Sequence, residues 1–195
     1  MTEQQWEKKL KIKTTGRDAS RADAYRYPYE PTPYCVLERL VDSGYLDRGN
    51  VVVDYGCGRG RASLFLHHCL GCRTIGVEYD ETIYVQAIEN LRAYGGMDEV
   101  SFVCDRAERF CVDEADRFYF FNPFSLEVLQ SVIGRILESY YGKPRTVRLF
   151  FYYPSDAYRT WLMTRDFLNF LAELDCGDLF PGNDRRETIL IFDVA

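Results

Sequence analysis

The sequence contains no long apolar run and only two histidines among its 195 residues. No stretch approaches the roughly 20 consecutive apolar residues that a membrane-spanning helix requires. The first residues, Met1-Thr-Glu-Gln-Gln-Trp, contain no apolar core of the kind found in a secretory signal. We therefore expect a cytoplasmic protein with no membrane partner.

The cysteines form no recognisable framework for disulfides or for a metal. There are seven, an odd number, at positions 35, 57, 69, 72, 104, 111 and 176, and we expect them to be reduced. Cys69 and Cys72 have C-x-x-C spacing, but a zinc site requires a second pair of ligands. His67 and His68 are adjacent and, on a helix, point in different directions. We expect no metal site.

The composition indicates one folded domain with an uneven charge. Hydrophobic residues make up 47% and aromatic residues 15%, which excludes a disordered chain. The net charge is −6, yet residues 1–26 contain seven Lys and Arg against four Asp and Glu, which leaves 17 against 26 elsewhere. An acidic body matches a polyanionic nucleic acid poorly. We interpret the basic stretch as a solvated, partly frayed extension in preference to an RNA-binding arm.

A glycine-rich turn follows the first apolar run. Residues 51–55 form a β-branched run typical of a buried strand, which ends in Asp54 and Tyr55. The turn contains three glycines at alternate positions: Gly56, Gly58 and Gly60. Glycine permits a tight turn and a close approach of a ligand, and the helix-forming stretch 61–70 comes next. A strand, a glycine turn and a helix in this order predict a cofactor site.

The spacing of these glycines differs from that of a dinucleotide site. The G-x-G-x-x-G fingerprint seats a pyrophosphate, and its third glycine would stand where this chain has Arg61. The pattern Asp54-x-Gly-x-Gly-x-Gly instead resembles the first motif of class I S-adenosylmethionine-dependent methyltransferases, whose ligand carries no phosphate. The resemblance implies that Asp54 lies near the cationic end of the cofactor. A nicotinamide-dependent oxidoreductase is disfavoured by Arg61.

Polar groups at further strand ends agree with this resemblance. Ligands of open α/β sheets bind outside the carboxyl ends of the strands. Glu78 ends the run 74–78, where the family binds both ribose hydroxyls with one carboxylate, and Asp105 ends the run 100–105, where the family contacts the adenine amino group. The resemblance implies the following cofactor contacts: Asp54, Tyr55, Gly56, Gly58, Gly60, Glu78, Tyr79, Asp105 and Asn122.

The motif Asn122-Pro123-Phe124 follows the fourth predicted strand. It resembles the motif of enzymes that methylate amine nitrogens, commonly Asp or Asn, two prolines and an aromatic, but it has one proline fewer. The resemblance implies that the Asn122 oxygen and a proline-adjacent carbonyl accept hydrogen bonds from the target amine, while Phe124 packs on a planar substrate. These three residues are therefore the candidate catalytic residues. In the alternative interpretation, Asn-Pro breaks the strand and Phe124 is a core residue.

A segment rich in tyrosine and proline, residues 25–34, precedes the domain's first helix. Its prolines make it stiff, and its position would allow it to fold over the cofactor mouth. We predict that Tyr29 and Thr32 help to close the site. Packing against the sheet edge is the alternative.

Hydrophobic periodicity predicts the order of the elements. We expect helices at 2–13, 32–43, 61–70, 81–94, 125–141 and 155–165, and strands at 51–55, 74–78, 100–105, 118–124, 145–153, 170–180 and 187–194. The turn-rich link at 181–184 predicts an antiparallel hairpin between the last two strands. Together with the resemblance, this order implies an α/β, doubly wound, Rossmann-like sheet of seven strands, mostly parallel with an antiparallel C-terminal hairpin strand. Residues 1–31 are assigned to an N-terminal extension or lid, and 32–195 to the methyltransferase domain.

The sequence thus predicts an S-adenosylmethionine-dependent methyltransferase whose acceptor is an amine nitrogen on a protein, a small molecule or a nucleobase. In-line transfer from a sulfonium relies on alignment and desolvation, so a catalytic histidine is not required. The alternative is a binding module that holds S-adenosylmethionine or another nucleoside without catalysis. No heptad pattern indicates a coiled coil, and we expect a monomer.

Overall fold

The computed structural model describes residues 1–195 except 20–24, 26, 96–97 and 183. Its strands are β1 (Val51–Tyr55), β2 (Arg73–Glu78), β3 (Val100–Cys104), β4 (Arg117–Phe121), β5 (Arg148–Tyr152), β6 (Leu168–Asp175) and β7 (Thr188–Val194). They form one sheet in the order β3-β2-β1-β4-β5-β7-β6. Neighbours from β3 to β5 pair in parallel, whereas β7 runs antiparallel to β5 and β6. The predicted seven-stranded sheet with an antiparallel hairpin is confirmed.

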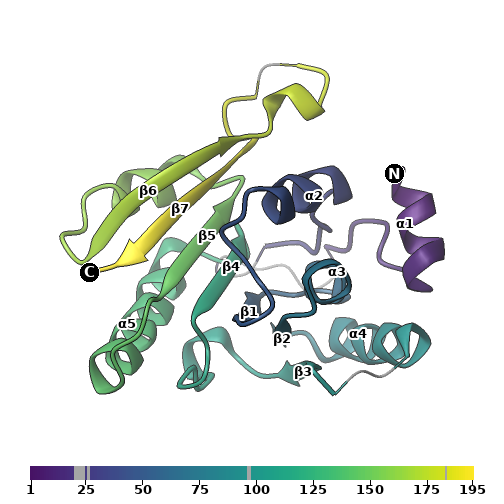
Figure 1. Cartoon of the computed structure of the whole chain (residues 1–195), viewed down its shortest axis with the longest axis horizontal. Helices are drawn as coiled ribbons and strands as arrows, with labels where there is room; N and C mark the ends of the chain where they lie inside the picture. The colour runs from purple at the N-terminus through teal and green to yellow at the C-terminus, as the bar shows by residue number, and fades with distance from the viewer. Residues whose placement is uncertain (20–24, 26, 96–97, 183) are drawn as a thin grey trace.

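Helices cover both faces of this sheet (Figure 1). They are α1 (Glu3–Leu10), α2 (Tyr34–Asp42), α3 (Arg61–Leu70), α4 (Glu81–Tyr94), α5 (Leu126–Gly142) and α6 (Asp156–Leu162). The first four pack their apolar side chains into one core, represented by Leu37 and Phe65. Helices α5 and α6 pack into the other, represented by Ile133 and Tyr158. This two-faced cover is the doubly wound arrangement that the sequence predicts.

Local sequence signals set the starts of several helices. The side chain of Asp80 accepts a hydrogen bond from the Thr82 N–H and begins α4, and Ser125 does the same for Val128 at the start of α5. Such caps satisfy backbone donors that have no partner inside the helix. The cap of α4 also keeps the end of β2 next to the start of that helix.

Several predicted element boundaries are wrong: the predicted strand 118–124 ends at Phe121, the predicted strand 145–153 begins at Arg148, and the predicted helix 155–165 ends at Leu162. The helix predicted at 2–13 ends at Leu10, because Lys11 adopts a left-handed conformation (φ 59°) and its N–H caps the carbonyls of the last turn. The strand predicted at 170–180 is β6, which begins at Leu168, ends at Asp175 and is followed by a 3₁₀ turn over Gly177–Leu179. Within the predicted link at 181–184, residue 183 lies outside the described residues.

The interpretation of the N-terminal stretch as a frayed extension is also wrong for α1. Trp6 and Leu10 are 6% and 1% exposed and belong to the core. The Trp6 ring meets the Phe65 ring edge-on at a centroid distance of 4.8 Å, and its indole N–H donates to Glu38 at 2.8 Å. Aromatic burial of this size holds α1 on α3. Within the described residues, none of the helices has the length and apolar character needed to span a bilayer.

Candidate functional site

A pocket lies at the carboxyl ends of the central strands. The order of the sheet reverses between β1 and β4, and such a switch point leaves a crevice outside the strand ends. The pocket encloses about 1020 Å³ of space between atoms, part of it open to solvent. Of the predicted site residues, the following line it: Tyr29, Thr32, Asp54, Gly56, Glu78, Tyr79, Asp105, Pro123 and Phe124. Residues from four strand ends and from the N-terminal segment therefore meet in one place.

The glycine turn after β1 is packed closely by other side chains. Gly56 and Gly58 have φ values of 71° and 58°, which L-residues rarely adopt. A Cβ at Gly58 would lie 2.2 Å from the Tyr29 ring, and one at Gly56 would lie 2.5 Å from Cβ of Pro123. Gly58 and Gly60 do not line the pocket. Because they have no Cβ, Gly58 and Gly60 allow the turn to pack against the rings of Tyr29 and Phe102.

Glu78, the last residue of β2, holds its carboxylate in the pocket wall. One oxygen accepts the Gly58 N–H at 2.9 Å and the other accepts the Asp80 N–H at 2.9 Å. Burial raises the pKa of this carboxyl. Each carboxylate oxygen has further acceptor capacity beyond these bonds. The carboxylate is thus fixed in orientation and still able to accept hydrogen bonds from a ligand.

Asp54, at the end of β1, is a buried acid of the wall. It is 3% exposed and accepts a hydrogen bond from the Ser63 hydroxyl at 2.8 Å. Burial raises the pKa of this carboxyl to about 7. A cation in the pocket would favour its ionised form, because opposite charges at short range stabilise each other.

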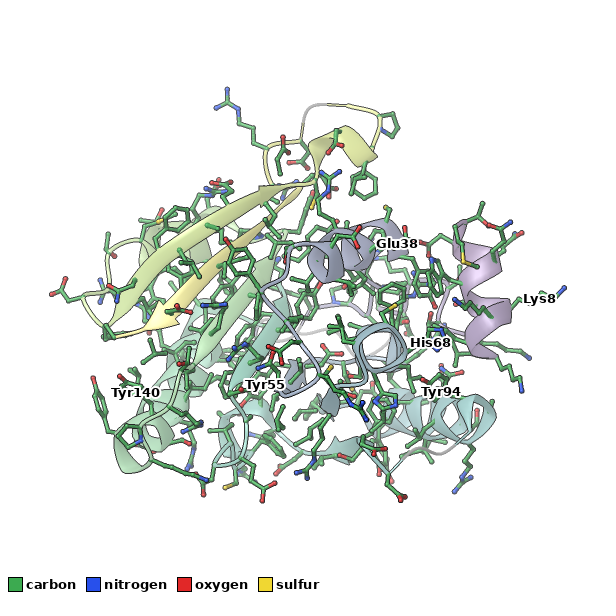
Figure 2. All side chains as sticks on the ribbon, viewed as in Figure 1. Lys8, Glu38, Tyr55, His68, Tyr94 and Tyr140 are labelled. Atoms are coloured by element: carbon green, nitrogen blue, oxygen red, sulfur yellow. The ribbon has the colours of Figure 1, made fainter. Side chains whose placement is uncertain are left out.

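Tyr55 is placed differently from the prediction. Adjacent residues of a strand point to opposite faces, so the side chain of Tyr55 leaves the pocket as that of Asp54 enters it. The Tyr55 ring is 1% exposed, stacks on Phe120 at 5.2 Å and lies in the core on the α5 face (Figure 2). Only its main chain stays near the glycine turn. The predicted cofactor contact of Tyr55 is therefore limited to its main chain.

Asp105 and Tyr79 form the outer part of the pocket wall. Asp105 is half-buried, and its backbone N–H donates to the Glu78 carbonyl at 3.0 Å. Tyr79 is 42% exposed. These two residues can reach the more solvated end of a ligand whose inner end lies against Glu78.

Asn122 lies beside the pocket but not among its lining residues. Its backbone has a positive φ of 41°, and its Oδ1 is shielded from solvent without a hydrogen-bond partner among the described residues. Such an unpaired buried acceptor is costly and is typical of functional sites. The carbonyl of Pro123 accepts the Tyr27 N–H at 3.2 Å, so the N-terminal segment already uses this acceptor.

Phe124 combines both roles that the sequence left open. It lines the pocket, yet it is only 4% exposed and packs edge-on against Phe120 at 6.2 Å. Its carbonyl accepts the buried Tyr158 hydroxyl at 2.6 Å. The ring is therefore held rigidly by the α5 core while one part of it faces the pocket.

Residues 27–32 form the pocket wall opposite the strand ends. Tyr29 exchanges backbone hydrogen bonds with Asp18 at 2.8 and 3.0 Å, and its hydroxyl donates to the Thr14 carbonyl at 2.5 Å. Thr32 shares a buried hydrogen bond of 3.0 Å with the hydroxyl of Tyr119. The segment is therefore tied both to the N-terminal stretch and to β4.

Arg61 has a role that sequence reasoning missed. It is 3% exposed, its Nε donates to Thr14 Oγ1 at 2.6 Å, and it forms ion pairs with Glu3 and Glu7. It also donates to the carbonyl of Thr32 at 3.1 Å. The spacing of Glu3 and Glu7 by one helical turn is the only sequence signal for this cluster, since it places both acids on one face.

Charge in the pocket wall is mostly negative. Among the described lining residues, Arg61 is the one cation, and its guanidinium is engaged by α1. The carboxylates of the lining are Asp18, Glu30, Asp54, Glu78, Asp80, Asp105 and Glu108. Such a wall opposes a pyrophosphate and favours a neutral or cationic ligand.

Comparisons with known proteins find structural likeness only. No protein-family model and no curated protein matches the sequence. An RNA methyltransferase from Salinibacter ruber, solved with S-adenosylhomocysteine, is 19% identical with a TM-score of 0.60, over 85% of this chain and 94% of that one. A dimethyladenosine transferase from Plasmodium falciparum is 10% identical with a TM-score of 0.59, over 85% of this chain and 63% of that one.

The fold is also found in an enzyme of another reaction class. A precorrin 8W decarboxylase from Methanobacterium thermoautotrophicum is 20% identical with a TM-score of 0.61, over 86% of this chain and 92% of that one. At these identities the likeness concerns the fold, and function depends on the site. The chain has the Rossmann-like α/β fold of the class I methyltransferases.

Proposed function

We propose that this protein is an S-adenosylmethionine-dependent methyltransferase that acts on an amine nitrogen. One observation carries the proposal: Asp54, Glu78 and Asp105, from the ends of three adjacent strands, line a single pocket. A nucleoside linked to an amino acid offers hydroxyl and amino donors to each of these acceptors.

The residues of the pocket fit such a ligand better than a dinucleotide. Arg61 occupies the position of the third dinucleotide glycine, and its side chain fills the space at the start of α3. The lining carboxylates would repel phosphate groups. A ligand with a sulfonium charge and no phosphate needs no space for a pyrophosphate at the start of α3, and the lining carboxylates do not repel it.

Each acid has a role in this proposal. The Glu78 carboxylate, oriented by Gly58 and Asp80, accepts from the two ribose hydroxyls. Asp105 accepts from the adenine amino group, and Asp54 lies near the cationic end. When bound, S-adenosylmethionine supplies a methyl group activated by a positively charged sulfur.

The acceptor end of the pocket is assigned to the loop after β4. Asn122 Oδ1, which accepts no hydrogen bond from the described residues, is the acceptor proposed to orient the target N–H. An amide oxygen accepts a hydrogen bond but does not take up the proton, so the proton of the amine leaves to solvent or to a lining carboxylate. Phe124 packs beside the substrate, and residues 27–32 exclude water from this end.

Calorimetric titration with S-adenosylmethionine and S-adenosylhomocysteine tests the cofactor. Glu78→Ala is expected to weaken binding by about 1–3 kcal/mol, because a buried acceptor for two hydroxyls is lost. Glu89→Ala, on the exposed side of α4 and outside the pocket, is the matched control and should leave binding unchanged. Absence of binding by the wild-type protein would refute the proposal.

Asn122→Ala separates an enzyme from a non-catalytic binding module. If the enzyme proposal holds, this variant keeps cofactor affinity within about twofold and loses on the order of 10²-fold in turnover, as for other lost orienting groups. Unchanged turnover in Asn122→Ala would remove this residue from the mechanism. A monomer in the cytoplasm remains our expectation, which light scattering and localisation of a tagged chain can check.

A further inference from the structure

The N-terminal stretch presents a row of exposed cations, which we call the basic strip. It consists of Lys8, Lys9, Lys11, Lys13 and Arg17, all of them exposed. Four of the five lysines of the chain lie in it, and the fifth is Lys143. Figure 2 shows Lys8 extending from α1 away from the body of the molecule. The net charge of the chain is −6, so the positive charge of the basic strip lies apart from a predominantly acidic remainder.

The two acids of α1 pair with a buried arginine and not with the basic strip. Glu3 and Glu7 contact the buried guanidinium of Arg61 on the inner side of α1. Glu7 also accepts from the Thr14 hydroxyl at 2.7 Å and from the Thr15 N–H at 2.8 Å. The carboxylates of α1 therefore pair with Arg61, while Lys8 and Lys9 remain exposed, Lys9 with its ammonium 4.5 Å from the centre of the Trp6 ring.

The chain after α1 keeps its cations on one side. Ile12 and Thr14 are buried, whereas Lys13 and Arg17 are exposed. The main chain of Lys13 is fixed by Asn90 of α4, which accepts its N–H at 2.8 Å and donates to its carbonyl at 3.2 Å. The basic strip is thus held in place by the fold before any ligand binds.

This strip ends at the pocket. The carbonyl of Thr14 accepts a hydrogen bond from the hydroxyl of Tyr29. Asp18 exchanges backbone hydrogen bonds with Tyr29 and lines the pocket. Arg59 lies over the Tyr29 ring at 4.8 Å and donates to the Thr15 carbonyl at 2.9 Å. The last cation of the basic strip, Arg17, is therefore next in sequence to Asp18 of the pocket wall.

Exposed tyrosines gather at the same mouth. Tyr27 and Tyr79 line the pocket and are 44% and 42% exposed. Tyr25, which is 50% exposed, lines a smaller hollow that shares Glu108 and Val128 with the pocket. Several exposed aromatic rings around one opening offer a surface on which bases can stack.

We propose that the methyl acceptor is a base of a single-stranded nucleic acid. The proposal rests on the methyltransferase function above. The basic strip neutralises backbone phosphates, and the tyrosines stack on bases that single strands leave accessible. The carboxylates of the pocket repel phosphates but admit a neutral base, so the backbone stays outside while one base enters.

The transfer step balances with these components alone. The lone pair of the base amine forms the new N–C bond as the S–C bond of the cofactor breaks. The electron pair of that bond returns to sulfur, which becomes a neutral thioether, and the amine releases one proton to solvent. No further reactant is required.

Fluorescence anisotropy with a labelled single-stranded RNA of mixed sequence, about 20 nucleotides long, tests the proposal. The wild-type protein should bind with an affinity that falls steeply between about 50 and 200 mM salt. The triple variant K8Q/K11Q/K13Q should lose about tenfold or more in affinity and reduce the slope of log K against log salt by about 2. Lys143→Gln, an exposed lysine after α5, is the matched control and should bind as the wild type does.

A second pair of variants tests the aromatic contact. Tyr27→Ala should weaken binding at least about fivefold with little change in the salt slope, since stacking is not ionic. Tyr141→Ala is the control, because Tyr141 is 65% exposed on α5 and lines none of the pocket. Circular dichroism melts and titration with S-adenosylhomocysteine establish that all variants are folded and bind the cofactor product.

The outcomes distinguish this inference from the proposed function. If S-adenosylhomocysteine binds but the RNA does not, or if Lys143→Gln weakens RNA binding as much as the triple variant, the nucleic-acid inference is wrong and the cofactor proposal stands. Equal or tighter binding of a duplex of the same sequence also overturns it. So does methyl transfer to a polyamine or a basic peptide by a protein that binds no oligonucleotide. Loss of cofactor binding itself refutes the proposed function.

Discussion

The Nε of Arg61 donates a hydrogen bond of 2.6 Å to the hydroxyl of Thr14, across 47 residues of sequence. Both side chains are buried, and the guanidinium also lies 4.3 Å from the centre of the Tyr34 ring. Arg61 begins the helix that follows the glycine turn, and Thr14 belongs to the stretch that supports Tyr29. This contact therefore connects the floor of the pocket to its N-terminal wall.

Arg61→Ala should destabilise the protein by about 3–5 kcal/mol, because it removes the cation paired with the partly buried Glu7 and the donor to the buried Thr14 hydroxyl. Arg73→Ala is the matched control, since Arg73 forms an exposed ion pair with Glu114 and should cost at most about 1 kcal/mol. Urea denaturation measures both. Equal effects of the two substitutions would contradict the role assigned to Arg61.

Trp6→Ala should lower the free energy of unfolding by about 3–5 kcal/mol, because the ring is buried against Phe65. The control is Val85→Ala at a position of α4 that is 48% exposed, which should change stability by about 0.5 kcal/mol or less. Thermal melts followed by circular dichroism compare them. A Trp6→Ala melt like that of the wild type would support a frayed α1 instead.

Gly58→Ala should destabilise the protein and weaken cofactor binding. The new methyl group would meet the Tyr29 ring in a left-handed backbone conformation that costs about 1–3 kcal/mol by itself. Gly134→Ala in α5 has open space and ordinary backbone geometry, and it should stabilise the protein by about 0.5–1 kcal/mol. Opposite signs for these two glycine-to-alanine changes are the expected result, and calorimetric melting and titration measure them.

Asp54 should make both stability and cofactor binding depend on pH. Burial raises its pKa to about 7, so between about pH 4 and 7 the folded state holds a proton that the unfolded state has released. The free energy of unfolding should therefore fall as pH rises through this window, and Asp54→Asn should remove that contribution. A bound cation favours the ionised carboxylate, so affinity for S-adenosylmethionine should rise from pH 6 to 8 in the wild type and stay level in Asp54→Asn. A level profile in both proteins would exclude Asp54 from the cationic end.

The sequence by itself determined the sheet and the position of the pocket. The run at 51–55, the glycines after it and the acids at 78 and 105 are local signals, and parallel strands bring their carboxyl ends to one edge. The C-terminal hairpin followed from two apolar runs and a turn-rich link, although β6 ended earlier than expected. The side on which Tyr55 lies could also have been read from strand alternation.

Only the tertiary structure decided the rest. Helix α1 packs on the domain because Trp6 hydrogen-bonds to Glu38 and its ring contacts Phe65. The role of Arg61 depends on Glu3 and Glu7, which are more than 50 residues away in the sequence. The carbonyl of Pro123 accepts a hydrogen bond from the N–H of Tyr27, and Oδ1 of Asn122 has no hydrogen-bond partner among the described residues. These outcomes depend on contacts between segments distant in sequence, which periodicity within a single element does not encode. Local pattern therefore placed the pocket, and long-range packing decided which side chains complete it.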